Sequence, residues 1–328
     1  MKSFKKALLG VAVSAAFAAS APASATTLAI ADMNIFSLGL VNVAGVPFGP
    51  SNGTLTIVSE SRTGTADSSF NGVVGAGAGA GSITSTVVGA TVDVGNRCAG
   101  NCAGIGAALY GGVQENNNST HLLPPGSRNF ALGDMFISGN ALGGGISGLV
   151  RADAATVGST NSGGSNATIK NAASITGAFG LSGAFTGSVA IAADWFIRAY
   201  VDSLAPVKGT ADAGFGWNMR ITSADDAGFT TLVFSPSDLN QSYFSTQSSQ
   251  NQSFQDNNSV SNALSNPAGG FGQVYVSDVR TFLTGKTYNF SINQSSNAAV
   301  SEIPEPSSLA LLGLGLLGLA ALRRRNSA

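Results

Sequence analysis

Residues 194–202 read Asp-Trp-Phe-Ile-Arg-Ala-Tyr-Val-Asp, and residues 215–222 read Phe-Gly-Trp-Asn-Met-Arg-Ile-Thr. In both stretches every second residue is apolar, beginning at Trp195 and at Phe215. Residues 286–292 repeat the pattern with Tyr288, Phe290 and Ile292. Strict alternation predicts β-strands that bury one face, so these stretches determine the fold class.

Turn residues between the apolar runs, among them Pro206, Pro236 and Pro267, separate the predicted strands. Residues 141–187 consist mostly of Gly, Ala, Ser, Thr and Asn, which predicts long, thin strands that pack closely. The chain is therefore predicted to be all-β, a β-sandwich of jelly-roll type between an N-terminal signal helix and a C-terminal membrane helix. A β-solenoid is the alternative, although no fixed repeat of 20–50 residues is visible.

Two further segments have a characteristic composition. Residues 82–94 are rich in β-branched side chains and are expected to form a strand. Residues 241–262 are almost entirely Ser, Asn, Gln and Asp with three aromatic residues, and are expected to form a long surface loop. Such a loop is either a recognition element or a mobile segment.

The N-terminus has the order of a secretory signal. Lys2, Lys5 and Lys6 precede a short apolar stretch, and Ala23-Ser24-Ala25 is a small-residue cleavage site. Residues 1–25 are therefore assigned to a signal peptide, with the Sec translocase and signal peptidase as partners. Residues 19–21 offer a second cleavage site.

The C-terminus carries a second signal in residues 304–328. Pro304-Glu305-Pro306 is followed by an uncharged Leu/Ala/Gly stretch over residues 309–322 and then by Arg323, Arg324 and Arg325. Fourteen helical residues span roughly 21 Å, short of a hydrocarbon core of about 30 Å, so the helix needs the arginines to snorkel or the bilayer to thin. Three glycines in this helix match G-x-G-x-x-G, but no strand and no βαβ unit can surround them.

This three-part pattern resembles the PEP-CTERM sorting signal, with Ile303 where the family usually has valine. The resemblance implies a Gram-negative source, recognition by an exosortase and transient anchoring in the inner membrane. It further implies processing near Pro304-Glu305-Pro306 and release to the outer envelope or the extracellular matrix of a biofilm. A plain C-terminal membrane anchor is the alternative. The resemblance covers about residues 303–325 and implies nothing about the activity of the body, residues 26–303.

Charge excludes several classes of function. The two signals hold six of the 16 basic residues and one of the 17 acidic residues, so the body has a formal charge of −6. No basic excess exists to neutralise phosphates, which excludes a nucleic-acid binder. His121 is the single histidine, so a multi-histidine metal centre is impossible, and no cofactor or metal is expected.

Few residues in the body suggest chemistry. Cys98 and Cys102 predict a small disulfide loop with a turn at Gly100, because disulfides persist in exported proteins; a redox pair or half of a metal site is the alternative. His121 lacks an accompanying G-x-S-x-G motif and is expected on the surface. Asp225 and Asp226 are expected in a turn rather than as an acid–base pair.

Three functions remain. The first is a non-enzymatic structural protein of the cell envelope or matrix, associated with exopolysaccharide. The second is a carbohydrate-binding or adhesive module in which Trp195, Trp217 and Tyr275 stack on sugars, although alternating aromatics are more often core residues. The third is a secreted hydrolase with two facing carboxylates, for which no pair of residues stands out.

Overall fold

The protein is a two-layer β-sandwich. The computed structural model describes residues 25–77, 81–102, 129–157, 165–203, 208–247 and 273–303. The all-β prediction is confirmed, and the pairing between strands is antiparallel, so the solenoid alternative is wrong. The predicted helices of the two export signals and His121 lie outside the described residues.

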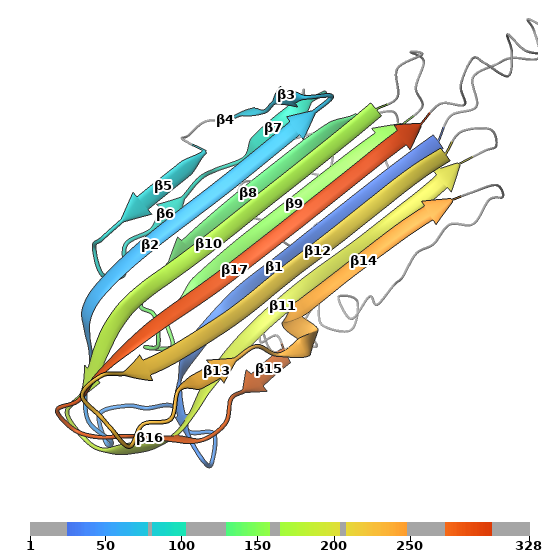
Figure 1. The fold of residues 1–328 in the computed structure, drawn as a ribbon. Coiled ribbons are helices and arrows are strands. Elements are labelled where there is room, and N and C mark those ends of the chain that lie inside the picture. Colours follow the sequence, from blue (N-terminus) through green and yellow to red (C-terminus); the bar gives the residue numbers. More distant parts are fainter. Residues whose placement is uncertain are drawn as a thin grey trace, which may run out of the picture.

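Sheet A follows the order β15-β11-β1-β9-β8-β7-β4, with β16 beside β11 and β6 beside β8 (Figure 1). Sheet B follows the order β13-β12-β17-β10-β2-β3, with β14 beside β12 and β5 beside β2.

The strands of sheet A are β1 (Ala25–Asn42), β4 (Ala76–Gly77), β6 (Val92–Asp93), β7 (Arg97–Gly100), β8 (Phe130–Ser138), β9 (Ser147–Val157), β11 (Phe185–Ser203), β15 (Gln273–Val276) and β16 (Arg280–Phe282). Those of sheet B are β2 (Leu55–Phe70), β3 (Val73–Val74), β5 (Ser82–Ser85), β10 (Ser165–Leu181), β12 (Lys208–Ser223), β13 (Leu232–Phe234), β14 (Asn240–Gln247) and β17 (Thr287–Ile303). Among the described residues there is one short 3₁₀ helix, η1 (Ser237–Leu239), which precedes β14.

The chain changes sheet at most of its long connections, from β1 to β2, β9 to β10, β10 to β11 and β11 to β12. A jelly roll alternates between its two sheets in the same manner. β1 and β17 are central strands of opposite sheets, and their Ala25 and Ile303 ends lie at the same end of the sandwich (Figure 1). We call this end the terminal pole and the other end the aromatic pole.

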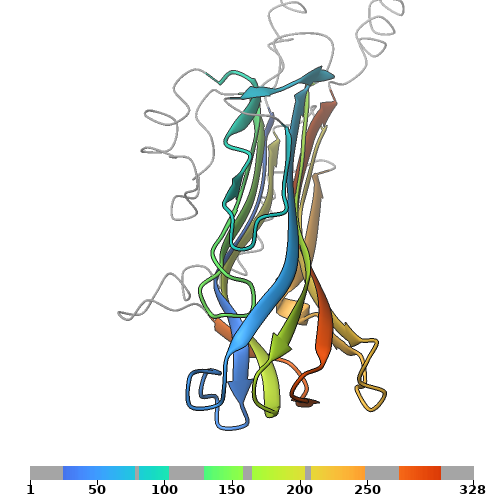
Figure 2. The same ribbon diagram turned by 90° about the vertical axis from the view of Figure 1, so that its left-hand side faces the viewer.

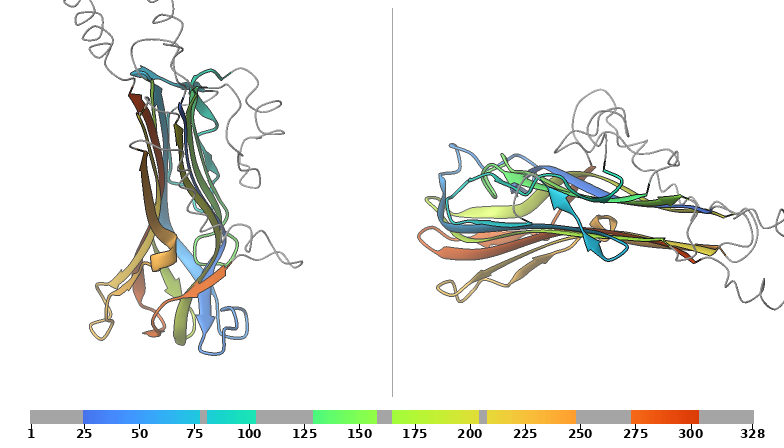
Figure 3. Two further views of the ribbon diagram at one scale, coloured as in Figure 1. Left: turned by 90° about the vertical axis from the view of Figure 1, so that its right-hand side faces the viewer. Right: turned by 90° about the horizontal axis from the view of Figure 1, so that it is seen from above.

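The distance between the sheets changes along the sandwich (Figure 2). Near the terminal pole the inner faces carry alanine, including Ala29, Ala152, Ala213 and Ala298, all buried. At the other end Phe179, Phe282, Tyr288 and Phe290 fill the core, with Phe179 and Tyr288 stacked at 5.5 Å between ring centroids. Small side chains permit the close approach, and the aromatic rings separate the sheets toward the aromatic pole (Figure 3).

Polar side chains connect the two inner faces where the sheets are close. Gln294 on β17 donates its Nε2 hydrogen to the carbonyl of Met33 on β1 at 2.9 Å. The amide of Asn171 on β10 donates to the carbonyl of Arg151 on β9 and to the hydroxyl of Ser296 at 3.3 Å. Through these bonds the Nε2 of Gln294 and the Nδ2 of Asn171 each donate to a backbone carbonyl of the opposite layer, whereas the Oδ1 of Asn171 is buried without a hydrogen-bond partner.

Two sequence-based expectations need correction. Residues 82–94 were expected to form one strand, but they form β5 and β6 with a turn between them at Gly89, whose φ is +72°. Residues 241–262 were expected to be a loop, but Asn240–Gln247 is strand β14, paired along Gly209–Gly216 of β12. The remainder of that segment lies outside the described residues. Pairing with a neighbouring strand outweighed the polar composition.

Candidate functional site

The cysteines and the paired aspartates have structural roles. A disulfide joins Cys98 to Cys102 beside the turn at Gly100, whose φ is +89°. Asp225 accepts hydrogen bonds from Ser223 Oγ at 2.9 Å and from the Thr287 amide at 3.0 Å, and these bonds lower its pKa. Asp226 accepts from Tyr288 Oη at 2.9 Å. The two carboxylates hold the turn after β12 against the start of β17, in the turn context expected for them.

The aromatic residues proposed for sugar stacking lie mainly in the core. Trp217 is fully buried, and its ring lies 5.4 Å from that of Phe234. Trp195 is 5% exposed and lies 5.2 Å from Phe215. Tyr275 on β15 is half-buried and accepts a hydrogen bond from Trp195 Nε1 at 3.4 Å. Neither tryptophan presents a ring face to solvent, which removes them as a sugar-stacking platform.

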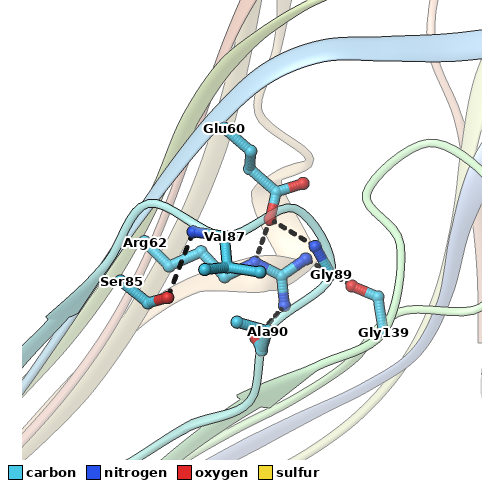
Figure 4. A network of polar contacts seen from close by, with 7 residues as sticks. All are labelled: Glu60, Arg62, Ser85, Val87, Gly89, Ala90 and Gly139. Carbon is cyan, nitrogen blue, oxygen red and sulfur yellow. Dashed lines mark hydrogen bonds and ion pairs between the residues drawn. The ribbon is translucent and has the colours of Figure 1, made fainter.

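A buried ion pair lies inside the sandwich on β2. Arg62, which is fully buried, donates from Nε to the carboxylate of Glu60 (Figure 4). Its other nitrogens donate to the carbonyl of Ala90 at 2.7 Å and to that of Gly139. The Gly89 amide donates to Glu60 at 3.3 Å. The Arg62 guanidinium therefore links β2 to the turn after β5 and to the residue that follows β8. This buried charge stabilises the arrangement of the three segments.

The face of sheet A that points away from the core is also buried. It carries an apolar cluster that includes Leu28, Ile30, Phe130 and Tyr200. Beside it, Arg151 on β9 lies opposite Asp32 of β1 and Asp134 of β8, and it bonds Asp153 at 2.8 Å. We call Asp32, Asp134, Arg151, Asp153, Asp194 and Arg198 the ionic cluster.

The ionic cluster contains four carboxylates and two guanidinium groups. Asp194 on β11 is half-buried, and its Oδ1 has no hydrogen-bond partner. Burial raises the pKa of Asp194 to about 6, and the neighbouring charge of Asp32 adds to the shift. Among the described residues no three His, Cys, Asp or Glu side chains are arranged to hold a metal ion. The four carboxylates outnumber the two guanidinium groups, and the raised pKa of Asp194 reflects its burial beside Asp32.

The outward face of sheet B is different, because it is exposed and mostly polar. Along β17 the residues Asn289, Ser291, Asn293, Ser295 and Asn297 point outward and are exposed or half-exposed. One row across the sheet consists of Thr63, Ser174, Asn293 and Asn218 on β2, β10, β17 and β12. Asn293 Nδ2 donates to Asn218 Oδ1 at 3.1 Å. We call this surface the polar face.

Charge is sparse on the polar face. Asp67 and Lys170 lie opposite each other on β2 and β10, and Arg220 and Asp212 lie on β12. The other outward positions of β10, and of β17 up to Ser301, are Ser, Thr, Asn, Ala and Gly, and the hydroxyl and amide groups among them both donate and accept hydrogen bonds. The edge strands β13 and β14 add the exposed apolar residues Val233 and Phe244. Strands repeat at about 4.8 Å, and same-face residues along a strand at about 6.8 Å, so the hydroxyl and amide groups form a regular array.

The described residues line one small internal cavity and one surface depression. One is an internal cavity of about 10 Å³ lined by Ile35, Leu38 and Gln294 among others, enough for one water molecule. The other is a surface depression of about 340 Å³ around Phe229, Thr230 and Arg280. Neither is lined by a carboxylate.

The export motifs meet the fold at its terminal pole. β1 begins at Ala25, the residue before the predicted mature N-terminus, and β17 ends at Ile303, the residue before Pro304. Ala23 and the motif residues Pro304, Glu305, Pro306, Arg323, Arg324 and Arg325 lie outside the described residues. In the part of the chain that is described, no helix has the length and apolar character needed to cross a membrane.

Comparison with known proteins identifies one feature. The PEP-CTERM protein-sorting motif matches residues 302–325. This range begins at Glu302, the second-to-last residue of β17. No curated protein and no solved structure matches the chain. The motif supports an exported protein that an exosortase sorts.

Replacing Arg62 by Met is expected to destabilise the protein strongly. The substitution leaves the buried Glu60 carboxylate without its cation and releases the Ala90 and Gly139 carbonyls, which costs about 3–5 kcal/mol. Urea unfolding measures the loss. The double variant Glu60→Gln with Arg62→Met should recover a large part of it, and a double variant as unstable as the single one would contradict this explanation.

Replacing Asp194 by Asn is expected to stabilise the protein at neutral pH. The folded-state pKa of about 6 lies above the unfolded value near 3.9, so folding favours the protonated carboxyl. The wild-type protein therefore loses stability as pH rises from about 4 to about 6, whereas the variant lacks this loss. Thermal unfolding at pH 4 and pH 7 should show a variant advantage of about 1–2 kcal/mol at pH 7, after discounting partial exposure, and little at pH 4. Equal differences at both pH values would contradict the assignment.

Proposed function

We propose that this PEP-CTERM protein is a non-enzymatic structural component of the outer envelope or extracellular matrix, where its polar face contacts neutral exopolysaccharide. The PEP-CTERM sorting motif at residues 302–325 is the observation that carries the proposal. After export by the Sec translocase and signal peptidase, an exosortase processes the chain near Pro304-Glu305-Pro306. Transient anchoring in the inner membrane precedes release.

The position of the first and last described residues of the sandwich supports this order of events. Ala25 and Ile303 lie at the same pole although they belong to different sheets (Figure 1). A protein held first by its N-terminal signal and then by its C-terminal signal presents the same pole to the membrane at both stages. The sandwich therefore folds without having to turn over between the two stages.

The polar face supports the choice of partner. A neutral polysaccharide offers hydroxyl groups that donate and accept, and the Ser, Thr and Asn side chains of the polar face do the same. Serine and threonine lose little side-chain entropy when they are ordered, so an extended polymer can bind over many weak contacts. Because the central row of Ser174, Asn293 and Asn218 carries no charge, this binding is expected to persist at high salt.

Loss of the exosortase is expected to trap the protein at the inner membrane. Without cleavage near Pro304-Glu305-Pro306 the chain retains its C-terminal apolar segment and stays larger. Immunoblots of membrane, envelope and medium fractions from cells with and without the enzyme measure both size and location. Reintroducing the exosortase is the control and should restore the smaller, released form. A protein of unchanged size and location in the deletion strain would overturn the sorting step.

The triple variant Ser174→Ala, Asn218→Ala, Asn293→Ala is expected to bind exopolysaccharide at least about tenfold more weakly, because it loses several hydrogen bonds of about 1 kcal/mol each. Co-sedimentation with exopolysaccharide isolated from the same cells measures retention at low and high salt. The matched control, Ser51→Ala with Thr284→Ala, changes exposed residues away from the polar face and should bind as the wild type does. Equal binding by the triple variant, or binding abolished by salt, would contradict the assignment of this surface.

A further inference from the structure

Strand β14 (Asn240–Gln247) is the edge strand of sheet B beside β12. It pairs with Gly209–Gly216 of β12 on one side, and no described strand pairs with its other side (Figure 1). The opposite edge of the sheet differs, because the short strands β3 and β5 lie along β2 there. An edge strand presents backbone donors and acceptors that can pair with another strand.

The sequence of β14, Asn-Gln-Ser-Tyr-Phe-Ser-Thr-Gln, contains no charged residue, no proline and no glycine. Proteins usually block pairing at sheet edges with lysine, proline, bulges or inward-pointing charges, and β14 has none of the residues that do so. The pairing of β14 with β12 is also free of register shifts. The strand is therefore regular and suited to continuing the sheet.

Phe244 lies at the middle of this edge and is 64% exposed. It stands opposite Asp212 of β12, on the outward side of the sheet, where the neighbouring positions are mostly polar. Exposed apolar residues are ordinary when scattered. A large aromatic side chain at the centre of an edge strand without charge, proline or glycine is different, because strand pairing there would bury it against its partner.

We propose that β14 pairs with β14 of a second copy of this chain, antiparallel about a two-fold axis at Phe244. In this register residues 241 to 247 of one copy pair with residues 247 to 241 of the other, and both polar faces point the same way. The two Phe244 side chains lie directly opposite, with Cβ atoms about 5 Å apart. A two-fold contact of this kind uses the same surface twice and closes on itself.

Charge permits this pairing. β14 is uncharged, so no like charges meet at the contact. The nearest carboxylates across the outward surface, Asp212 of each copy, are separated by three strand spacings, about 14 Å, which exceeds the Debye length of about 8 Å at physiological salt. The dimer unites two copies of sheet B into one sheet, which doubles the width of the polar face without rearranging either sandwich.

A cysteine at the proposed axis tests the register directly. In the exported full chain, where Cys98 and Cys102 are bonded to each other, Phe244→Cys supplies a new thiol that faces its own copy across the axis. Mild oxidation should yield a disulfide-linked dimer on a non-reducing gel. Asn218→Cys, exposed on the same face but on β12, is the matched control and should remain monomeric. Failure of the Phe244→Cys protein to cross-link would overturn the proposed register.

A charge at the edge tests the association itself. Sedimentation of the wild-type chain should show a dimer that forms as concentration rises, and Phe244→Lys should remain monomeric. Val233→Lys, at a residue 67% exposed on β13 of the same sheet, is the control and should still dimerise. Circular dichroism and thermal unfolding verify that both variants fold. A wild-type protein that is monomeric at every concentration, or a Phe244→Lys dimer, would refute the proposal, whereas neither result depends on exosortase processing or on polysaccharide binding.

Discussion

The close approach of the two sheets near the terminal pole is the constraint on which the remaining structure depends. Alanines such as Ala29, Ala152 and Ala213 fill the inner faces there, so the layers approach without interdigitating large side chains. At this separation the amides of Gln294 and Asn171 reach backbone carbonyls of the opposite sheet. A larger residue at these positions would separate the sheets and leave those amides buried without partners.

The contrast between the two outward faces follows from which strands form each sheet. Sheet A places Arg151 between Asp32 and Asp134, and this face is buried with Leu28 and Phe130 beside the charges. Sheet B places serine, threonine and asparagine outward along β10, β12 and β17, and this face is exposed. The buried ionic cluster and the exposed polar face therefore belong to different layers. The raised pKa of Asp194 belongs to sheet A, and the exposed uncharged side chains of the polar face belong to sheet B.

Several parts of the fold were predictable from local pattern. The alternation beginning at Trp195 and Phe215 predicted β11 and β12, and it placed both tryptophans on an inward face. Small residues over 141–187 predicted the thin, close-packed strands β9, β10 and β11. The position of Asp225 and Asp226 in a turn was also predictable, because neighbouring carboxylates beside Gly228 favour one. β14 was missed because a polar strand lacks apolar alternation, and its pairing with β12 arises between residues distant in sequence.

The sequence by itself determined the sorting motif, which supports an exported protein, and the fold class. Both are encoded in contiguous patterns: the motif at residues 302–325 and the period of two along the strands. Only the tertiary structure decided which outward face is buried, which residues form the row of Thr63, Ser174, Asn293 and Asn218, and which strand lies at the edge beside β12. The alternation of apolar and polar residues predicts which face of a strand is buried, but it does not predict which strands become neighbours in a sheet. That choice depends on pairing between segments far apart in the chain, and it places Phe244 on the strand beside β12 and Arg151 between two aspartates.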